Sequence, residues 1–77
     1  MITIYSTPTC VYCKMAKQFL GEHKIAYTEK DVASDAAARE EMVKKSGQLG
    51  VPVIDIDGQI IVGFDREKIS ELLHVSS

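Results

Sequence analysis

The 77-residue sequence lacks several features, and each absence excludes a class of protein. No apolar run approaches the roughly 20 residues that a membrane-spanning helix requires. There is no basic arm, low-complexity tract or internal repeat, and the net charge of −2 argues against a nucleic-acid-binding surface. The chain has no tryptophan and only two cysteines. We expect one small domain over residues 1–77, near the lower size limit for folding without help.

The pattern at the start of the chain does not predict a secretory leader. The first residues, MITIYS, alternate in polarity like a strand and show neither the basic start nor the apolar core of a signal peptide. We therefore expect a cytoplasmic protein. In that compartment a lasting disulfide is rare, and a Cys-x-x-Cys pair more often serves redox chemistry or binds a metal.

The apolar residues that are present follow strand and helix periods in the order βαβαββα. Period-two patterns predict strands, and recurrence at three and four residues predicts helices. The predicted strands are residues 2–6, 25–32, 51–56 and 59–62, and the predicted helices are residues 10–23, 36–45 and a last one that begins at Asp65 and buries Ile69, Leu72 and Leu73.

Turn and cap residues fall between these segments. Ser34 or Asp35 can cap the second helix, Gly47 is placed to end it, and Asp57-Gly58 is a strong hairpin signal between two apolar runs. A strand–helix–strand unit at the start implies parallel pairing with a right-handed crossover. The sequence therefore predicts a compact α/β domain with a four-stranded mixed sheet and helices on both faces.

The two cysteines lie in the stretch TPTCVYCK, where the first strand gives way to the first helix. Free N–H groups and the positive end of the helix dipole face a group at Cys10 and favour its thiolate. Cys13, three residues later, lies on the same helix face. This spacing suits a cycle in which Cys10 attacks a disulfide and Cys13 resolves the mixed disulfide.

Other interpretations of the pair remain open from the residues alone. The cysteines can be two structural thiols in a redox-inert interaction domain. A zinc or iron–sulfur site needs about four ligands, and only His23 and His74 could add to the pair. A metal- or cluster-carrying module would therefore require two chains that share the ion.

Three motifs resemble the glutaredoxin group of the thioredoxin superfamily: CVYC after a strand, GVPVI about forty residues later, and GFD before the last helix. The resemblance covers essentially the whole chain and implies a thioredoxin-like fold and a thiol-disulfide oxidoreductase. It implies that Cys10 is the nucleophile and Cys13 the resolving thiol. The two would form a redox-active disulfide, with no bound cofactor and no metal. We expect a monomer that reduces disulfide-containing proteins or mixed disulfides.

The resemblance also implies a substrate site beside Cys10. The proline matched by Pro52 is cis in the family, and the backbone of the residue matched by Val51 pairs like a strand with the peptide part of the substrate. Tyr12 corresponds to a ring that borders the glutathione site. Gln48 corresponds loosely to a polar residue near the glycine carboxylate of glutathione, which would act as a co-substrate.

The γ-glutamyl end of glutathione would lie at the start of the last helix. Gly63 and Asp65 match a Gly-Gly-x-Asp-like segment whose backbone and acid hold that end in the family, and a helix N-terminus can bind its carboxylate. Phe64 stands where the second glycine would be. For Asp65, a role as helix cap is compatible with either function.

The sequence departs from the glutathione-binding pattern at other positions. Ser6–Thr9 offer no cation in place of the lysine that often precedes the motif, and Lys44 or Lys45 would have to substitute for it. Val11 replaces the proline of CPYC. Together with Gly63-Phe64, this resembles the short glutaredoxin-like redoxins that serve ribonucleotide reductase and accept electrons from thioredoxin reductase, although their tryptophan-containing segment is missing here. We expect weak glutathione binding, and glutathione or a flavoprotein thioredoxin reductase as electron donor.

Overall fold

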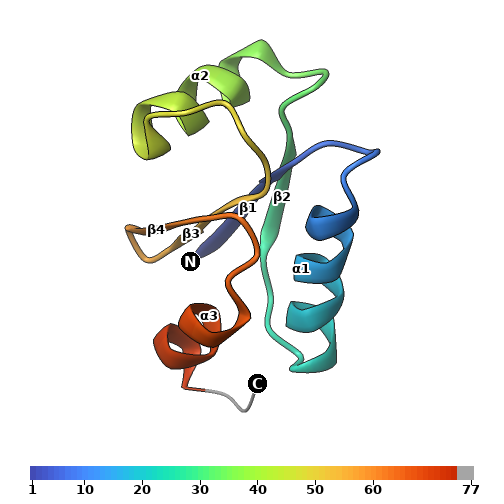
Figure 1. Ribbon diagram of the computed structural model, residues 1–77, viewed down its shortest axis with the longest axis vertical. Helices are drawn as coiled ribbons and strands as arrows, with labels where there is room; N and C mark the ends of the chain where they lie inside the picture. Colours follow the sequence, from blue (N-terminus) through green and yellow to red (C-terminus); the bar gives the residue numbers. More distant parts are fainter. Residues whose placement is uncertain (75–77) are drawn as a thin grey trace.

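The structure is a computed structural model that describes residues 1–74, and residues 75–77 of the predicted domain lie outside the described part. Its seven elements follow the predicted order βαβαββα (Figure 1). They are β1 (Ile2–Ser6), α1 (Val11–Glu22), β2 (Thr28–Asp31), α2 (Ala36–Ser46), β3 (Val53–Ile56), β4 (Gln59–Val62) and α3 (Arg66–Leu73). None of the helices within residues 1–74 is long and apolar enough to cross a membrane.

The four strands form one mixed sheet in the order β2-β1-β3-β4. β1 pairs with β2 in parallel, with Thr3 opposite Thr28. The pairing is parallel because α1 returns the chain to the end of the sheet at which β1 begins. β3 runs antiparallel to both β1 and β4. The predicted mixed sheet is therefore confirmed.

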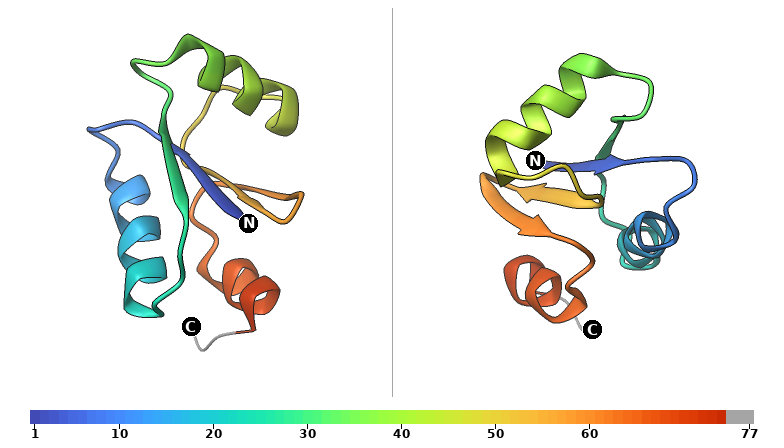
Figure 2. Two further views of the ribbon diagram at one scale, coloured as in Figure 1. Left: turned by 180° about the vertical axis from the view of Figure 1, so that it is seen from behind. Right: turned by 45° about the horizontal axis from the view of Figure 1, so that its top comes forward.

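Helices cover both faces of the sheet, as the sequence predicts. In Figure 2, α2 lies on one side and α1 and α3 on the other. Alternation along the strands explains this division, since neighbouring side chains point to opposite faces. The core under α1 and α3 contains Ile2, Ile4, Ala16, Phe19, Leu20, Ile54, Ile56, Ile61 and Ile69. The core under α2 contains Tyr5, Val32, Ala38, Met42 and Val53.

The second strand is shorter than the sequence predicts. Residues 25–32 were expected to be extended, but β2 includes only Thr28–Asp31. Lys24 and Ile25 instead close the C-terminal end of α1, because the N–H of Ile25 donates to the carbonyl of Leu20 at 2.9 Å and Lys24 has a positive φ of 56°. Ile25 then packs against the core under α1 and α3.

The caps and turns agree with the predicted ones. The Asp35 carboxylate accepts a hydrogen bond from the N–H of Ala38 at 3.1 Å, and Gly47 ends α2 with a φ of 74°. Asp57 and Gly58 both have positive φ in the β3–β4 turn. In α3, Ile69 is fully buried, whereas Leu72 and Leu73 are only partly buried against the core.

A polar cluster lies beneath α2 around the fully buried Tyr5. The Tyr5 hydroxyl donates to the Glu41 carboxylate at 2.6 Å and accepts from Lys45 Nζ at 3.0 Å. Lys45 also pairs with Asp55 at 2.7 Å, and Lys30 pairs with Glu41 at 3.1 Å. The hydrogen bonds from Tyr5 and Lys30 lower the pKa of Glu41 to about 2. These bonds tie α2 to β1, β2 and β3.

Candidate active site

Cys10 is the N-cap residue of α1, which confirms the predicted strand-to-helix position. The chain turns after β1, where the Cys10 N–H donates to the Thr7 carbonyl at 3.3 Å. Cys10 Sγ then accepts a hydrogen bond from the backbone N–H of Cys13 at 3.2 Å. The sulfur thus occupies the place of a capping oxygen, beside the positive end of the helix.

Cys13 lies behind Cys10 and is fully buried, whereas Cys10 is half-buried. The two thiols are not joined by a disulfide in this structure. Burial, followed by the hydrogen bond with Cys10, raises the pKa of the Cys13 thiol from 9.0 to about 12. The pair is therefore asymmetric, because only Cys10 is placed to meet a substrate from solution.

Val51 and Pro52 lie directly beside Cys10. Cys10 Sγ is 3.9 Å from the carbonyl oxygen of Val51, and the Val51-Pro52 peptide bond is cis, as the resemblance implies. Pro52 is buried, and its carbonyl accepts a hydrogen bond from the N–H of Gly63 at 2.8 Å. Gly63 has a φ of 82°, which favours glycine at this turn. This bond continues the β3–β4 pairing up to the cysteine pair.

An open groove of about 500 Å³ begins at this point. Its size lies in the range of small-molecule and cofactor sites. Six of the residues predicted for the substrate site line it together: Tyr12, Val51, Pro52, Gly63, Phe64 and Asp65. They come from the first turn of α1, the segment before β3 and the segment between β4 and α3. The groove therefore joins three segments that are far apart in the sequence, next to Cys10.

Three residues that the sequence analysis associates with the glycine carboxylate of glutathione, Gln48, Lys44 and Lys45, do not line the groove. The Gln48 side chain is used by its own loop, since Nε2 donates to the Gly50 carbonyl at 3.0 Å and Oε1 accepts from the Gly50 N–H. Lys45 is held by Asp55 and Tyr5 beneath α2. Lys44 lines a separate hollow on α2 with Leu49. No lysine therefore replaces the missing cation before the motif among the residues that line the groove.

Phe64 and Asp65 shape the end of the groove near α3. The Phe64 ring packs against Phe19 with 6.0 Å between ring centroids, so it forms a wall between the groove and the core. Asp65 caps α3, because its carboxylate accepts a hydrogen bond from the N–H of Lys68 at 3.1 Å. The predicted helix cap is thus confirmed.

Sequence reasoning missed two residues of the groove, Val62 and Arg66. Val62 is the last residue of β4 and is 53% exposed, which is a large exposure for an apolar side chain. Arg66 is the first residue of α3, and its guanidinium lies 5.4 Å from the centre of the Phe19 ring. A cation in the first turn of a helix is at the less favourable end of the dipole, and this was the available sequence signal.

The part of the chain that the structure describes contains no group of three or more His, Cys, Asp or Glu side chains that could hold a metal ion. His23 packs edge-on against Phe19 at 4.5 Å, and His74 ends α3. Neither histidine lines the groove beside Cys10. A metal site built on the cysteine pair would still require ligands from a second chain.

Comparison with known proteins identifies the family. Residues 2–61 match the glutaredoxin family model. The chain is 52% identical over 73 residues to a glutaredoxin-like 8.6 kDa protein in the rubredoxin operon of Clostridium pasteurianum, a match that covers 95% of this chain and 97% of that one. It is 44% identical over 64 residues to glutaredoxin 3 of Escherichia coli K12, covering 83% and 77% of the two chains.

A shorter redoxin and a solved structure match as well. The glutaredoxin-like protein NrdH of Lactococcus lactis is 33% identical over 72 residues, covering 94% of this chain and 99% of that one. The crystal structure of the thioredoxin-like protein BC3987 superposes with a TM-score of 0.89 at 38% identity, covering 94% and 99%. These matches support thiol oxidoreductase activity. The chain belongs to the glutaredoxin family.

Proposed function

We propose that this protein is a dithiol-disulfide oxidoreductase that reduces protein or mixed disulfides through Cys10 and Cys13. The observation that carries the proposal is the position of Cys10 Sγ. It accepts the N–H of Cys13 at 3.2 Å and lies 3.9 Å from the Val51 carbonyl, at the start of the groove. This sulfur is half-buried, so a disulfide can approach it from the groove, and it lies at the start of α1, whose free N–H groups can stabilise negative charge.

The reaction begins when the Cys10 thiolate attacks one sulfur of the substrate disulfide. A Cys10–substrate disulfide forms, the original S–S bond breaks, and the leaving thiolate takes a proton from water. The N–H of Cys13 and the first turn of α1 stabilise the charge on Cys10 before the attack. The main chain at Val51 can pair with an extended substrate segment, because it forms the wall of the groove nearest Cys10.

The second step is the attack of Cys13 on the sulfur of Cys10. Cys13 loses its proton to the solvent, the Cys10–Cys13 disulfide forms as the Cys10–substrate bond breaks, and the substrate leaves as a thiolate that takes up a proton. The two electrons that reduce the substrate come from the oxidation of the two cysteine thiols. Burial keeps Cys13 protonated in the resting protein, so it does not compete with Cys10 for the substrate in solution.

The oxidised pair must then be reduced by an electron donor, and we propose that glutathione is a poor one. A charge-assisted hydrogen bond to a glutathione carboxylate contributes on the order of 1.5–3 kcal/mol. The groove has no lysine for the glycine carboxylate, Lys45 is held by Asp55, and Gln48 is held by its own loop. A flavoprotein thioredoxin reductase is the alternative donor that we favour.

The proposal is tested by following disulfide reduction with each donor. The protein and a disulfide-containing substrate are supplied either with glutathione, glutathione reductase and NADPH, or with thioredoxin reductase and NADPH, and NADPH consumption is measured. We expect turnover with at least one donor for the natural sequence and none for Cys10→Ser. Full activity of Cys10→Ser would contradict the mechanism. Tight, saturable binding of glutathione at low micromolar concentration would contradict the proposed donor preference.

A further inference from the structure

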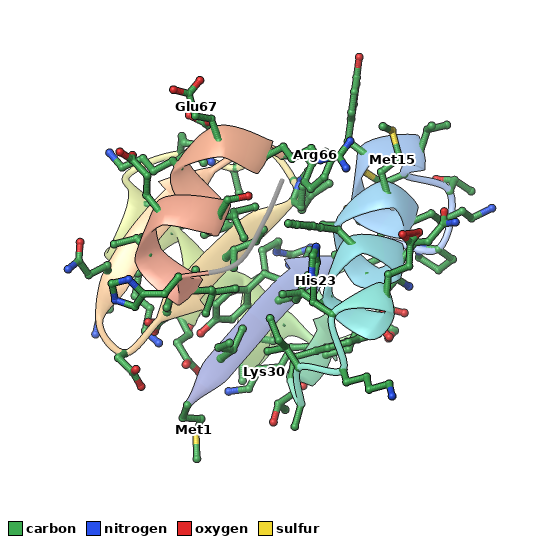
Figure 3. The ribbon with its side chains drawn as sticks, turned by 90° about the horizontal axis from the view of Figure 1, so that it is seen from below. Met1, Met15, His23, Lys30, Arg66 and Glu67 are labelled. Atoms are coloured by element: carbon green, nitrogen blue, oxygen red, sulfur yellow. The ribbon has the colours of Figure 1, made fainter. Side chains whose placement is uncertain are left out.

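Arg66 lies on the boundary between the groove and a smaller hollow on α1. It lines the groove with Tyr12 and Val62, and it also lines a hollow of about 150 Å³ with Met15 and Phe19. In Figure 3 Arg66 lies between α3 and α1 on the side of Met15, whereas Glu67 projects from the opposite side of α3. The exposed Arg66 side chain therefore lies on the side of α3 that faces α1 and the groove, whereas Glu67 points away from them.

The exposed guanidinium of Arg66 packs against one aromatic ring and, among residues 1–74, has no carboxylate partner. It lies 5.4 Å from the centre of the Phe19 ring, within the range of a cation–π contact. Within residues 1–74 no carboxylate lies within 4.0 Å of it. The neighbouring Asp65 carboxylate accepts the Lys68 N–H, and Glu22 lines only the smaller hollow. Arg66 is the one cation among the described residues that line the groove.

The rest of the groove suits a polypeptide. Tyr12 is 61% exposed and Val62 is 53% exposed, so the groove has apolar side chains open to a partner. The carbonyl of Val51 lies beside Cys10 and offers a main-chain acceptor. A peptide that places its disulfide at Cys10 and follows Val51 and Phe64 would carry its neighbouring side chains toward Arg66. The charge that complements a guanidinium is a carboxylate, which it can bind through two hydrogen bonds.

We propose that Arg66 is a specificity-determining residue that binds an Asp or Glu side chain of a protein substrate, close to the cysteine whose disulfide is reduced. The inference rests on the proposed function, since it concerns the substrates of the same site. The contact is made before the chemical step, so it changes how tightly the substrate binds and not how fast Cys10 attacks once it is bound. Disulfides flanked by acidic residues are then preferred over those flanked by neutral or basic residues.

The test uses three synthetic peptides that differ only in the residue beside a single cysteine, which is Glu, Gln or Lys. Each cysteine carries 2-thiopyridine as a mixed disulfide, and the pre-reduced protein is the only reductant. The Cys10 thiolate attacks the peptide sulfur, and the released 2-thiopyridone is followed by its absorbance. No electron donor is needed, so the measurement reports the substrate preference alone.

For the natural sequence we expect the Glu peptide to react about fivefold more efficiently than the Gln peptide at limiting concentration, the size of a partly exposed ion pair. The rates at saturation should be equal for the two peptides. Arg66→Gln should abolish this preference, and Arg66→Glu should reverse it in favour of the Lys peptide. Lys68→Glu is the matched control, because it makes the same charge change on α3 at an exposed residue that does not line the groove.

Several results would overturn the inference. Equal reaction of the Glu and Gln peptides with the natural sequence would do so, and so would a preference that survives in Arg66→Gln. The mixed disulfide of glutathione with 2-thiopyridine is a further arm. If Arg66→Gln slowed only that substrate, the residue would serve glutathione and not a protein. If no substrate reacted with the natural sequence, the proposed function itself would fail. Circular dichroism checks that each variant is folded.

Discussion

Replacing Cys10 by serine should leave a protein whose remaining thiol, Cys13, is almost inert to iodoacetamide at neutral pH. The reagent reacts with thiolates, and a pKa of about 12 in place of 9.0 leaves roughly a thousandfold fewer of them at pH 7, a factor of ten for each unit. The substitution removes the contribution of Cys10 to this pKa but leaves the burial of Cys13, which is its main cause. We therefore expect alkylation at least about a hundredfold slower than that of a model thiol.

The assay is mass spectrometry of the natural sequence, Cys10→Ser and Cys13→Ser after timed exposure to iodoacetamide. The natural sequence and Cys13→Ser should gain one adduct rapidly, because the Cys10 thiol is partly exposed beside the groove. Cys10→Ser should gain an adduct quickly only in urea, where Cys13 is exposed. Rapid alkylation of folded Cys10→Ser would refute the assignment of Cys13 as the protected, resolving thiol.

Two further predictions concern the polar cluster beneath α2. Tyr5→Phe removes a hydroxyl that forms hydrogen bonds with Glu41 and Lys45. Because these partners are partly exposed, we expect the substitution to lower the free energy of unfolding by only about 1 kcal/mol, measured by urea denaturation. The control Tyr12→Phe, at an exposed residue, should show no such loss. Because the pKa of Glu41 in the folded protein is about 2, below its ordinary 4.5, its contribution to stability is present above pH 4.5 and is lost as the pH falls toward 2. The urea midpoint should therefore fall less steeply between pH 4.5 and 2 in Glu41→Gln, and an unchanged slope would contradict this role for Glu41.

Most of the fold could be predicted from local patterns in the sequence. Capping residues such as Asp35 and Asp65, and the turn at Asp57-Gly58, act over three or four residues, so their effect can be derived from neighbours in the chain. The predicted length of the second strand is too great, because Ile25 is apolar without being part of a strand. It packs against the core while its backbone still closes the end of α1.

The candidate site could be predicted only in part, because the groove depends on long-range packing. The motif placed Cys10 and Cys13, but Lys45 could not be excluded as a groove cation without knowing that Asp55 and Tyr5 hold it. Arg66 was missed because its position beside the groove depends on α3 packing next to α1, where Phe19 meets the guanidinium. The unfavourable place of this cation in the first turn of α3 marks the residue as unusual, but it does not indicate which ring the guanidinium meets.

The most direct test of the proposed mechanism is to trap its intermediate. Cys13→Ser is incubated with a protein that carries a disulfide, and the products are separated without reductant and analysed by mass spectrometry. We expect a stable mixed disulfide between Cys10 and the substrate, because the thiol that would release it is absent. The natural sequence should instead give the reduced substrate and an internal Cys10–Cys13 disulfide. If Cys13→Ser formed no adduct with any disulfide substrate, or formed it at a residue other than Cys10, the mechanism would be contradicted.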